Sequence, residues 1–220
     1  MKYDTYIFDV DGTLLDTSEG IGNALNQICE RFGLAKISKE QAKKYVGPPL
    51  AQVILNMYPQ ATKEQVDTGV EIYREYFSRR GMYEAELYDG MRALLGYLKN
   101  QGARLGVASL KYQEAVELTI NHFKLNRYFD VSVGGDTYGK LTKHDVIEKC
   151  IAKLGAVDRN RIVMIGDSPY DAEGAVLSGI DFIAAIFGFG FTVGNVKDYS
   201  PVLSISSPMD ILNAINRSLL

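Results

Sequence analysis

The feature that most constrains the fold is a series of short apolar runs that alternate with helical patterns along most of the chain. The apolar runs lie at residues 3–8, 104–108, 130–133, 161–165 and 181–186. Most are nearly continuous, which is typical of parallel strands covered by helices on both faces. The helical patterns between them lie at about 90–101, 111–123, 142–154 and 171–179. The sequence therefore predicts an α/β fold with a doubly wound parallel sheet.

One long interval breaks this alternation, because residues 16–88 contain no convincing strand. Helical patterns fill it instead, at 18–32, 38–45, about 50–57 and 62–80. Thr62 and Gln65 have the spacing of a capping box at the start of the last helix. We therefore predict an α/β core formed by residues 1–15 and 89–220, with residues 16–88 inserted as a helical cap. An insertion there lies over the carboxyl ends of the strands, where open α/β folds bind ligands.

Composition and charge narrow the range of partners. The 220 residues carry 24 basic and 27 acidic side chains, a formal charge of −3, with no basic block. This argues against a nucleic-acid partner, which needs clustered Lys and Arg. No apolar run approaches the roughly 20 residues of a membrane helix, and no secretion signal precedes the first strand. We expect a cytoplasmic protein without a membrane partner, in which Cys29 and Cys150 stay free thiols.

Polar side chains follow the predicted strands at their carboxyl ends. Asp9 and Asp11 follow the first strand, Ser109 follows the second, and the stretch 166–171 (GDSPYD) follows the strand at 161–165. Converging carboxylates repel one another unless a cation lies among them. Aspartate oxygens suit Mg²⁺, which binds readily together with phosphate. A metal, a nucleophile, an acid/base and a lysine together make the inventory of phosphoryl transfer.

These motifs resemble those of phosphatases of the haloacid dehalogenase superfamily that carry a helical cap after the first motif. The phosphoglycolate phosphatase-like branch is the most similar. The resemblance spans essentially the whole chain, and DVDGT at 9–13 together with GDSPYD at 166–171 is highly specific. It implies a Mg²⁺-dependent hydrolase that acts on a small phosphorylated metabolite as a monomer or a small homo-oligomer.

The resemblance also implies roles for the central residues. Asp9 is the nucleophile that forms an aspartyl-phosphate, and Asp11 is the general acid/base. Mg²⁺ is held by Asp9, by the backbone carbonyl of Asp11 and by Asp167. A lysine neutralises the nucleophile and the phosphate. Lys143, which leads a helix, fits this position better than Lys140, which remains the alternative.

The phosphate-binding set implied by the resemblance is Gly12, Thr13, Ser109 and Leu110. Ser109 is expected to end a strand and begin a helix, so it either binds phosphate or is only an N-cap. Leu110 departs from the polar residue common in the family, which puts phosphate contacts there in question, whereas Lys111 matches the family's lysine. Gly12 fits a tight turn. Thr13 either positions Asp11 or only starts a helix.

Further positions are assigned to the surroundings of the site. Asp171 orients Lys143 or binds the metal through water, or else is simply a favourable acid in the first turn of a helix. Ser168 supports the site through its backbone or hydroxyl. The loop Gly47-Pro48-Pro49 faces the active site or merely separates two helices. The helical spacing of three aromatic residues predicts packing in the cap; these are Tyr73, Tyr76 and Phe77.

Other functions stay open or are disfavoured. A phosphomutase of the β-phosphoglucomutase type is the nearest rival, but the stretch 16–25 (DTSEGIGNAL) lacks the histidine of those enzymes. Pyrophosphatase and 5′-nucleotidase activities differ only in the leaving group and remain possible. The presence of Asp11 argues against dehalogenation. A non-catalytic binding module is disfavoured because Asp9, Asp11 and Asp167 are all present.

Overall fold

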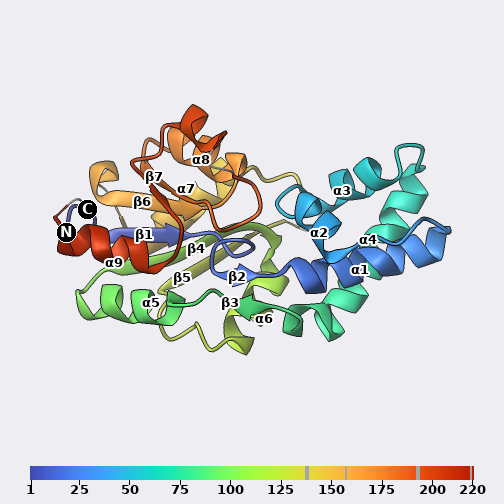
Figure 1. Cartoon of the computed structure of the whole chain (residues 1–220), viewed down its shortest axis with the longest axis horizontal. Helices are drawn as coiled ribbons and strands as arrows, with labels where there is room; N and C mark the ends of the chain where they lie inside the picture. Colours follow the sequence, from blue (N-terminus) through green and yellow to red (C-terminus); the bar gives the residue numbers. More distant parts are fainter. Residues whose placement is uncertain (137–138, 157, 192–193, 219) are drawn as a thin grey trace.

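A parallel sheet forms the centre of the molecule, as predicted. The computed structural model describes residues 1–136, 139–156, 158–191, 194–218 and 220. Within them six strands pair in the order β5-β4-β1-β6-β7-β8, and every pairing is parallel. Their bounds are β1 Thr5–Phe8, β4 Arg104–Tyr112, β5 Val131–Gly135, β6 Ile162–Gly166, β7 Asp181–Ala185 and β8 Leu203–Ile205. The α/β fold class is therefore confirmed (Figure 1).

Helices cover both faces of the sheet, which explains the continuous apolar runs of its strands. In β1, Tyr6 and Phe8 belong to one apolar cluster, whereas Ile7 between them belongs to the cluster on the opposite face. The first face packs against α5 (Met91–Asn100), α6 (Gln113–His122) and α9 (Met209–Asn216). The second packs against α7 (Lys143–Leu154) and α8 (Pro169–Leu177).

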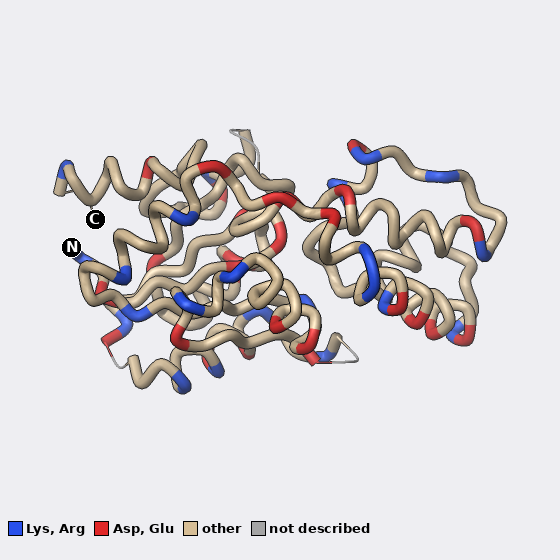
Figure 2. The backbone as a smooth tube through the Cα atoms, turned by 90° about the horizontal axis from the view of Figure 1, so that it is seen from below, with Lys and Arg blue, Asp and Glu red and all other residues tan. Residues whose placement is uncertain are grey.

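The helices of the interval predicted to be the cap lie together at one end of the elongated molecule, and we refer to them as the cap (Figures 1 and 2). Its members are α1 Ser18–Phe32, α2 Lys39–Ala42, the 3₁₀ turn Lys43–Tyr45, α3 Leu50–Met57, α4 Lys63–Arg79 and the 3₁₀ turn Gly81–Tyr83. A third apolar cluster lies mainly in the cap, where it includes Leu25, Ile54 and Phe77, and it extends to Ala115 of α6. The predicted capping box of Thr62 and Gln65 begins α4.

Two very short strands join the cap to the sheet. β2 (Leu15–Asp16) and β3 (Glu86–Leu87) pair antiparallel, so the chain enters and leaves the cap side by side. The prediction that residues 16–88 contain no strand is therefore wrong at both ends of the interval. Two-residue strands have no periodicity that a sequence pattern can reveal.

The second predicted strand and the helix after it have different bounds in the structure. β4 continues through Ser109 to Tyr112, and α6 begins only at Gln113. The expectation that Ser109 ends a strand and begins a helix is therefore wrong. The pairing of β4 with β5 shifts register between Ala108 and Tyr112. The pairing continues beyond this shift because Gly135 has no side chain. A Cβ at Gly135 would lie 2.6 Å from the carbonyl oxygen of Leu110, so only glycine allows the two backbones to approach this closely.

The C-terminal strand β8 and helix α9 are absent from the sequence prediction. β8 has only three residues, too few to establish an alternating pattern. Over the part of the chain that the structure describes, no helix combines the length and the apolar character needed to cross a membrane. Cys29 and Cys150 are buried and free, as expected.

Candidate active site

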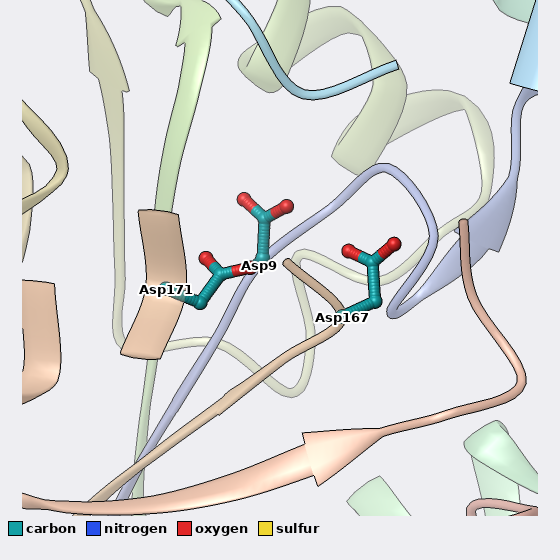
Figure 3. A group of neighbouring side chains, drawn as sticks. All are labelled: Asp9, Asp167 and Asp171. Atoms are coloured by element: carbon teal, nitrogen blue, oxygen red, sulfur yellow. The ribbon is translucent and has the colours of Figure 1, made fainter. Parts of the chain in front are cut away.

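Three aspartates meet where β1, β6 and α8 come together. Asp9 follows β1 and Asp167 follows β6, and the two strands are neighbours in the sheet. Asp171 lies in the first turn of α8 and is fully buried. One carboxylate oxygen from each residue lies within 4.8 Å of the others, and the three side chains lie side by side (Figure 3). The adjacency of the two parallel strands thus creates a compact acidic cluster.

Lys143 brings a buried positive charge to this cluster. It is the first residue of α7, and its Nζ lies 2.6 Å from Oδ1 of Asp9 and 2.6 Å from Oδ1 of Asp171. The contact with Asp171 agrees with the predicted orienting role. Lys140 lies in the preceding loop, where its backbone N–H donates to Asp136 at 2.9 Å. Of the two candidate lysines, the structure therefore brings Lys143 to Asp9.

Burial and mutual repulsion perturb the protonation of these groups. Burial raises the pKa of Asp9 to about 6, although the charge of Lys143 opposes the rise and that of Asp171 adds to it. Burial, together with Asp171 and Asp9, raises the pKa of Asp167 well above its ordinary value. Burial acts against the charged form of Lys143, but Asp171 and Asp9 outweigh it and raise the lysine's pKa. The cluster therefore holds more negative charge than its single lysine balances.

The loop after β7 supports Asp167, and the sequence analysis did not find this loop. The backbone N–H groups of Phe189 and Gly190 donate to Oδ2 of Asp167 at 2.7 and 3.3 Å. Thr13 donates its hydroxyl to Oδ1 at 3.4 Å. Thr13 was predicted either to position Asp11 or to start a helix. In the structure its hydroxyl contacts Asp167 instead. Backbone donors leave no side-chain motif in the sequence. The one feature that could have indicated this loop is the pair of glycines on either side of Phe189.

Asp11 lies outside the group of three aspartates and pairs with a second lysine. Its two carboxylate oxygens lie 2.8 and 3.0 Å from Nζ of Lys111, and both side chains are largely buried. The same Nζ lies 4.3 Å from the ring centre of Phe77 in the cap helix α4. Lys111 therefore connects the predicted acid/base to the cap. The role of the Asp11 backbone carbonyl as a metal ligand stays a prediction.

The remaining predicted residues lie around this centre. Gly12 has a φ of +79°, and a Cβ there would come within 2.2 Å of Oδ2 of Asp167, so its expected tight turn is present. Ser109 is buried, and its Oγ accepts the N–H of Lys111 at 3.3 Å. Ser168 donates from both its N–H and its hydroxyl to Asp171, at 3.0 and 2.6 Å. These bonds hold the turn between β6 and α8.

A cavity of about 550 Å³ lies between the carboxyl edge of the sheet and the cap. Asp9, Asp11 and Lys143 line it from the core, together with Ser109, Leu110 and Ser168. The loop Gly47-Pro48-Pro49 lines the cavity from the cap, which supports the prediction that this loop faces the site. The loop also separates two helices, since Pro49 directly precedes α3. Tyr73 and Phe77 line it too. The prediction that the aromatic residues serve packing alone is thus incomplete.

The fold and the site together define a class of protein. A buried aspartate paired with a lysine, beside further carboxylates and beneath a covered cavity, suits phosphoryl transfer, in which an anion must be positioned and its charge balanced. Residues 6–185 match the family model described as haloacid dehalogenase-like hydrolase. The chain therefore belongs to this family, as its motifs indicated.

Individual relatives differ in their named activities. The tyrosine-protein kinase PtkA of Mycobacterium tuberculosis is 32% identical over 84% of this chain, which spans only 62% of that relative's length. A 5′-nucleotidase of Pseudomonas aeruginosa is 30% identical, covering 86% of each chain. Other relatives, at 26–29% identity, are named phosphoglycolate phosphatase or pyrophosphatase PpaX. A predicted phosphatase from Clostridium acetobutylicum superposes with a TM-score of 0.90 at 33% identity, covering 99% of this chain and 100% of its own.

Proposed function

We propose that the protein is a Mg²⁺-dependent phosphomonoester hydrolase that uses Asp9 as its nucleophile. The observation that carries this proposal is the buried Asp9 carboxylate on the cavity wall, 2.6 Å from Lys143. A carboxylate can attack an anionic phosphate only where nearby positive charge offsets their repulsion. Membership of a hydrolase family that includes named phosphatases supports the same reaction class.

The donor set of the site fits Mg²⁺. The cluster of Asp9, Asp167 and Asp171 offers oxygen ligands only, which suits a hard cation. Lys143 forms ion pairs with Asp9 and Asp171. Burial and the nearby charges of Asp171 and Asp9 raise the pKa of Asp167, and within the described part of the chain the structure gives Asp167 no ion pair. We assign Mg²⁺ to Asp9, Asp167 and the backbone carbonyl of Asp11. When bound, the ion would neutralise charge on the phosphate and on the nucleophile.

The reaction proceeds in two displacements. A carboxylate oxygen of Asp9 attacks phosphorus, the bond from phosphorus to the ester oxygen breaks, and protonated Asp11 gives its proton to the departing alcohol. Asp11 then accepts a proton from water, which attacks the aspartyl-phosphate and releases inorganic phosphate and free Asp9. Lys143 and Ser109 stabilise the charge on the phosphoryl oxygens, and the cap excludes bulk water.

The experiment is phosphate release from a panel of phosphomonoesters, with Mg²⁺ and with EDTA. We expect Mg²⁺-dependent release by the wild type and a loss of at least about 10³-fold in Asp9→Asn, since no other group replaces a covalent nucleophile. Asp198→Asn, a change to an exposed aspartate, serves as the matched control and retains activity. Unimpaired turnover by Asp9→Asn, in protein shown to be folded, would reject the nucleophile assignment.

A further inference from the structure

The cavity is much larger than a small acid needs. Its volume of about 550 Å³ falls within the range of about 300–1,000 Å³ typical of pockets for drug-sized ligands. The phosphoryl group occupies only the end beside Asp9 and Lys143. A two-carbon leaving group such as glycolate would leave most of the remaining volume unfilled. The cap side of the cavity therefore accommodates a bulkier alcohol.

The charged residues on the cap side of the cavity balance one another. They are Lys63, Asp67, Glu71 and Arg74, two positive and two negative, all from α4. Lys63 is paired with Asp67 at 2.8 Å. The guanidinium of Arg74 lies 5.2 Å from the ring centre of Tyr112. Lys63, Asp67 and Glu71 are exposed. The cap wall as a whole therefore carries no net positive charge that would favour a second anionic group on the substrate.

Aromatic rings are the other prominent feature of the cavity. Tyr73 and Phe77 stack with their ring centres 5.7 Å apart and their planes 3° from parallel. Tyr45, Tyr112 and Tyr170 also line the cavity, amid many aliphatic side chains of α1, α3 and α4. Such a lining favours a ligand ring, which can stack on these faces or meet them edge to face.

We infer that the preferred substrate is a phosphomonoester of a neutral alcohol that carries an aromatic ring and is bulkier than glycolate. This inference rests on the proposed hydrolase function and names its substrate class. It favours esters with an aromatic ring over phosphoglycolate and pyrophosphate, whose leaving groups are small and anionic. A nucleobase and a phenol both supply an aromatic ring, and comparing their phosphate esters as substrates distinguishes the two.

The test compares kcat/KM of the Mg²⁺-loaded enzyme for five compounds. A nucleoside 5′-monophosphate and phenyl phosphate supply the two kinds of ring, glycerol phosphate is the neutral aliphatic ester, and phosphoglycolate and pyrophosphate are the anionic competitors. We expect at least one ring-bearing ester to exceed each of the other three by about tenfold or more. Preference for phosphoglycolate, pyrophosphate or glycerol phosphate overturns the inference but leaves the hydrolase proposal intact. No Mg²⁺-dependent release from any compound rejects the hydrolase proposal itself.

Variants of one ring test the structural basis. Tyr73→Leu is expected to lower the kcat/KM ratio of the preferred ring-bearing ester to glycerol phosphate about tenfold, mainly through KM. Tyr73→Phe keeps the ring and the ratio. Tyr83→Leu is the matched control, because Tyr83 is 51% exposed and is not among the residues that line the cavity. A ratio that stays unchanged in folded Tyr73→Leu contradicts the inference.

Discussion

At the scale of single residues, the structure separates two lysines that lie three positions apart. Lys143 is buried against Asp9 and Asp171, whereas Lys140 is an exposed loop residue. We expect Lys143→Met to lower turnover by about 10²–10³-fold, because the positive charge beside the phosphate is lost. It should also destabilise the metal-free protein by about 3–5 kcal/mol, since the buried carboxylates lose their partner.

Lys140→Met is the control for this prediction, with both variants assayed for phosphate release and for unfolding in denaturant. The exposed substitution should change the free energy of unfolding by less than about 0.5 kcal/mol. If Lys140→Met is the more damaging of the two, the assignment of the catalytic lysine is wrong.

The acidic cluster predicts a link between pH, metal and stability. Burial raises the pKa of Asp9 from 3.8 to about 6, and that of Asp167 rises as well. The folded metal-free protein therefore holds more protons than the unfolded chain, so these groups favour folding at low pH and lose that contribution as the pH rises through their folded pKa values. Mg²⁺ requires the deprotonated carboxylates, so it should raise Tm more at pH 8 than at pH 5.

Thermal unfolding with EDTA and with Mg²⁺ at both pH values measures this difference. Asp167→Asn should lose most of the Mg²⁺-dependent rise in Tm, because it removes a ligand and one of the buried acids. An equal rise at pH 5 and pH 8 in the wild type would show that the raised pKa values do not belong to the metal site.

At the scale of elements, the turn after β1 sets the position of Asp167. Gly12 and Gly102 have nearly the same backbone conformation, with φ angles of +79° and +78°. A Cβ at Gly12 would lie 2.2 Å from Oδ2 of Asp167, whereas a Cβ at Gly102 would have no atom within 4 Å. Both alanine variants incur backbone strain of about 1 kcal/mol. Only Gly12→Ala should also raise the Mg²⁺ concentration for half-maximal activity, by about tenfold or more.

Titration of activity with Mg²⁺ in the two variants checks this prediction. Gly102→Ala serves as the control for strain alone and should keep the wild-type Mg²⁺ requirement. Equal Mg²⁺ requirements in both variants would mean that the close approach of Gly12 to Asp167 has no bearing on the metal site.

Element positions also show what the sequence could predict. The apolar runs and the motifs at their ends predicted the parallel sheet and the meeting of Asp9 and Asp167, because adjacent parallel strands place their carboxyl ends together. Lys143, which the family resemblance indicated, joins them from the start of α7. The predicted helix start at Ser109 was wrong, since the length of β4 depends on pairing with glycines of β5, a contact between distant parts of the chain.

Two contacts in the site could not be predicted from the local sequence alone. Lys111 pairs with Asp11 across 100 positions of sequence, and the direction of a lysine side chain cannot be derived from its neighbours in the chain. The donors from Phe189 and Gly190 to Asp167 are backbone groups, which any residue except proline provides. Such contacts are established only when the strands are placed beside one another.

At the scale of the whole molecule, the short pairing of β2 and β3 leads us to predict that the cap can be removed from the core. Asp16 lies opposite Glu86 at the point where the chain enters and leaves the cap. Replacing residues 17–85 by Asn-Gly would close β2 and β3 as a two-residue hairpin. We expect the capless protein to fold, because the apolar clusters on the two faces of the sheet are formed by core residues.

The capless protein should keep weak Mg²⁺-dependent phosphatase activity, because Asp9, Lys143 and Asp167 all come from the core. Its kcat/KM for ring-bearing esters should fall by at least about 10²-fold, as water enters the site and the cap no longer holds the leaving group. Its preference among esters should largely disappear, since Tyr73 and Phe77 are removed with α4. Cooperative unfolding by circular dichroism establishes that the core is folded before these rates are compared. A folded capless protein that still prefers ring-bearing esters would place the specificity in the core, at Leu110, Tyr112 or Tyr170, rather than in the cap.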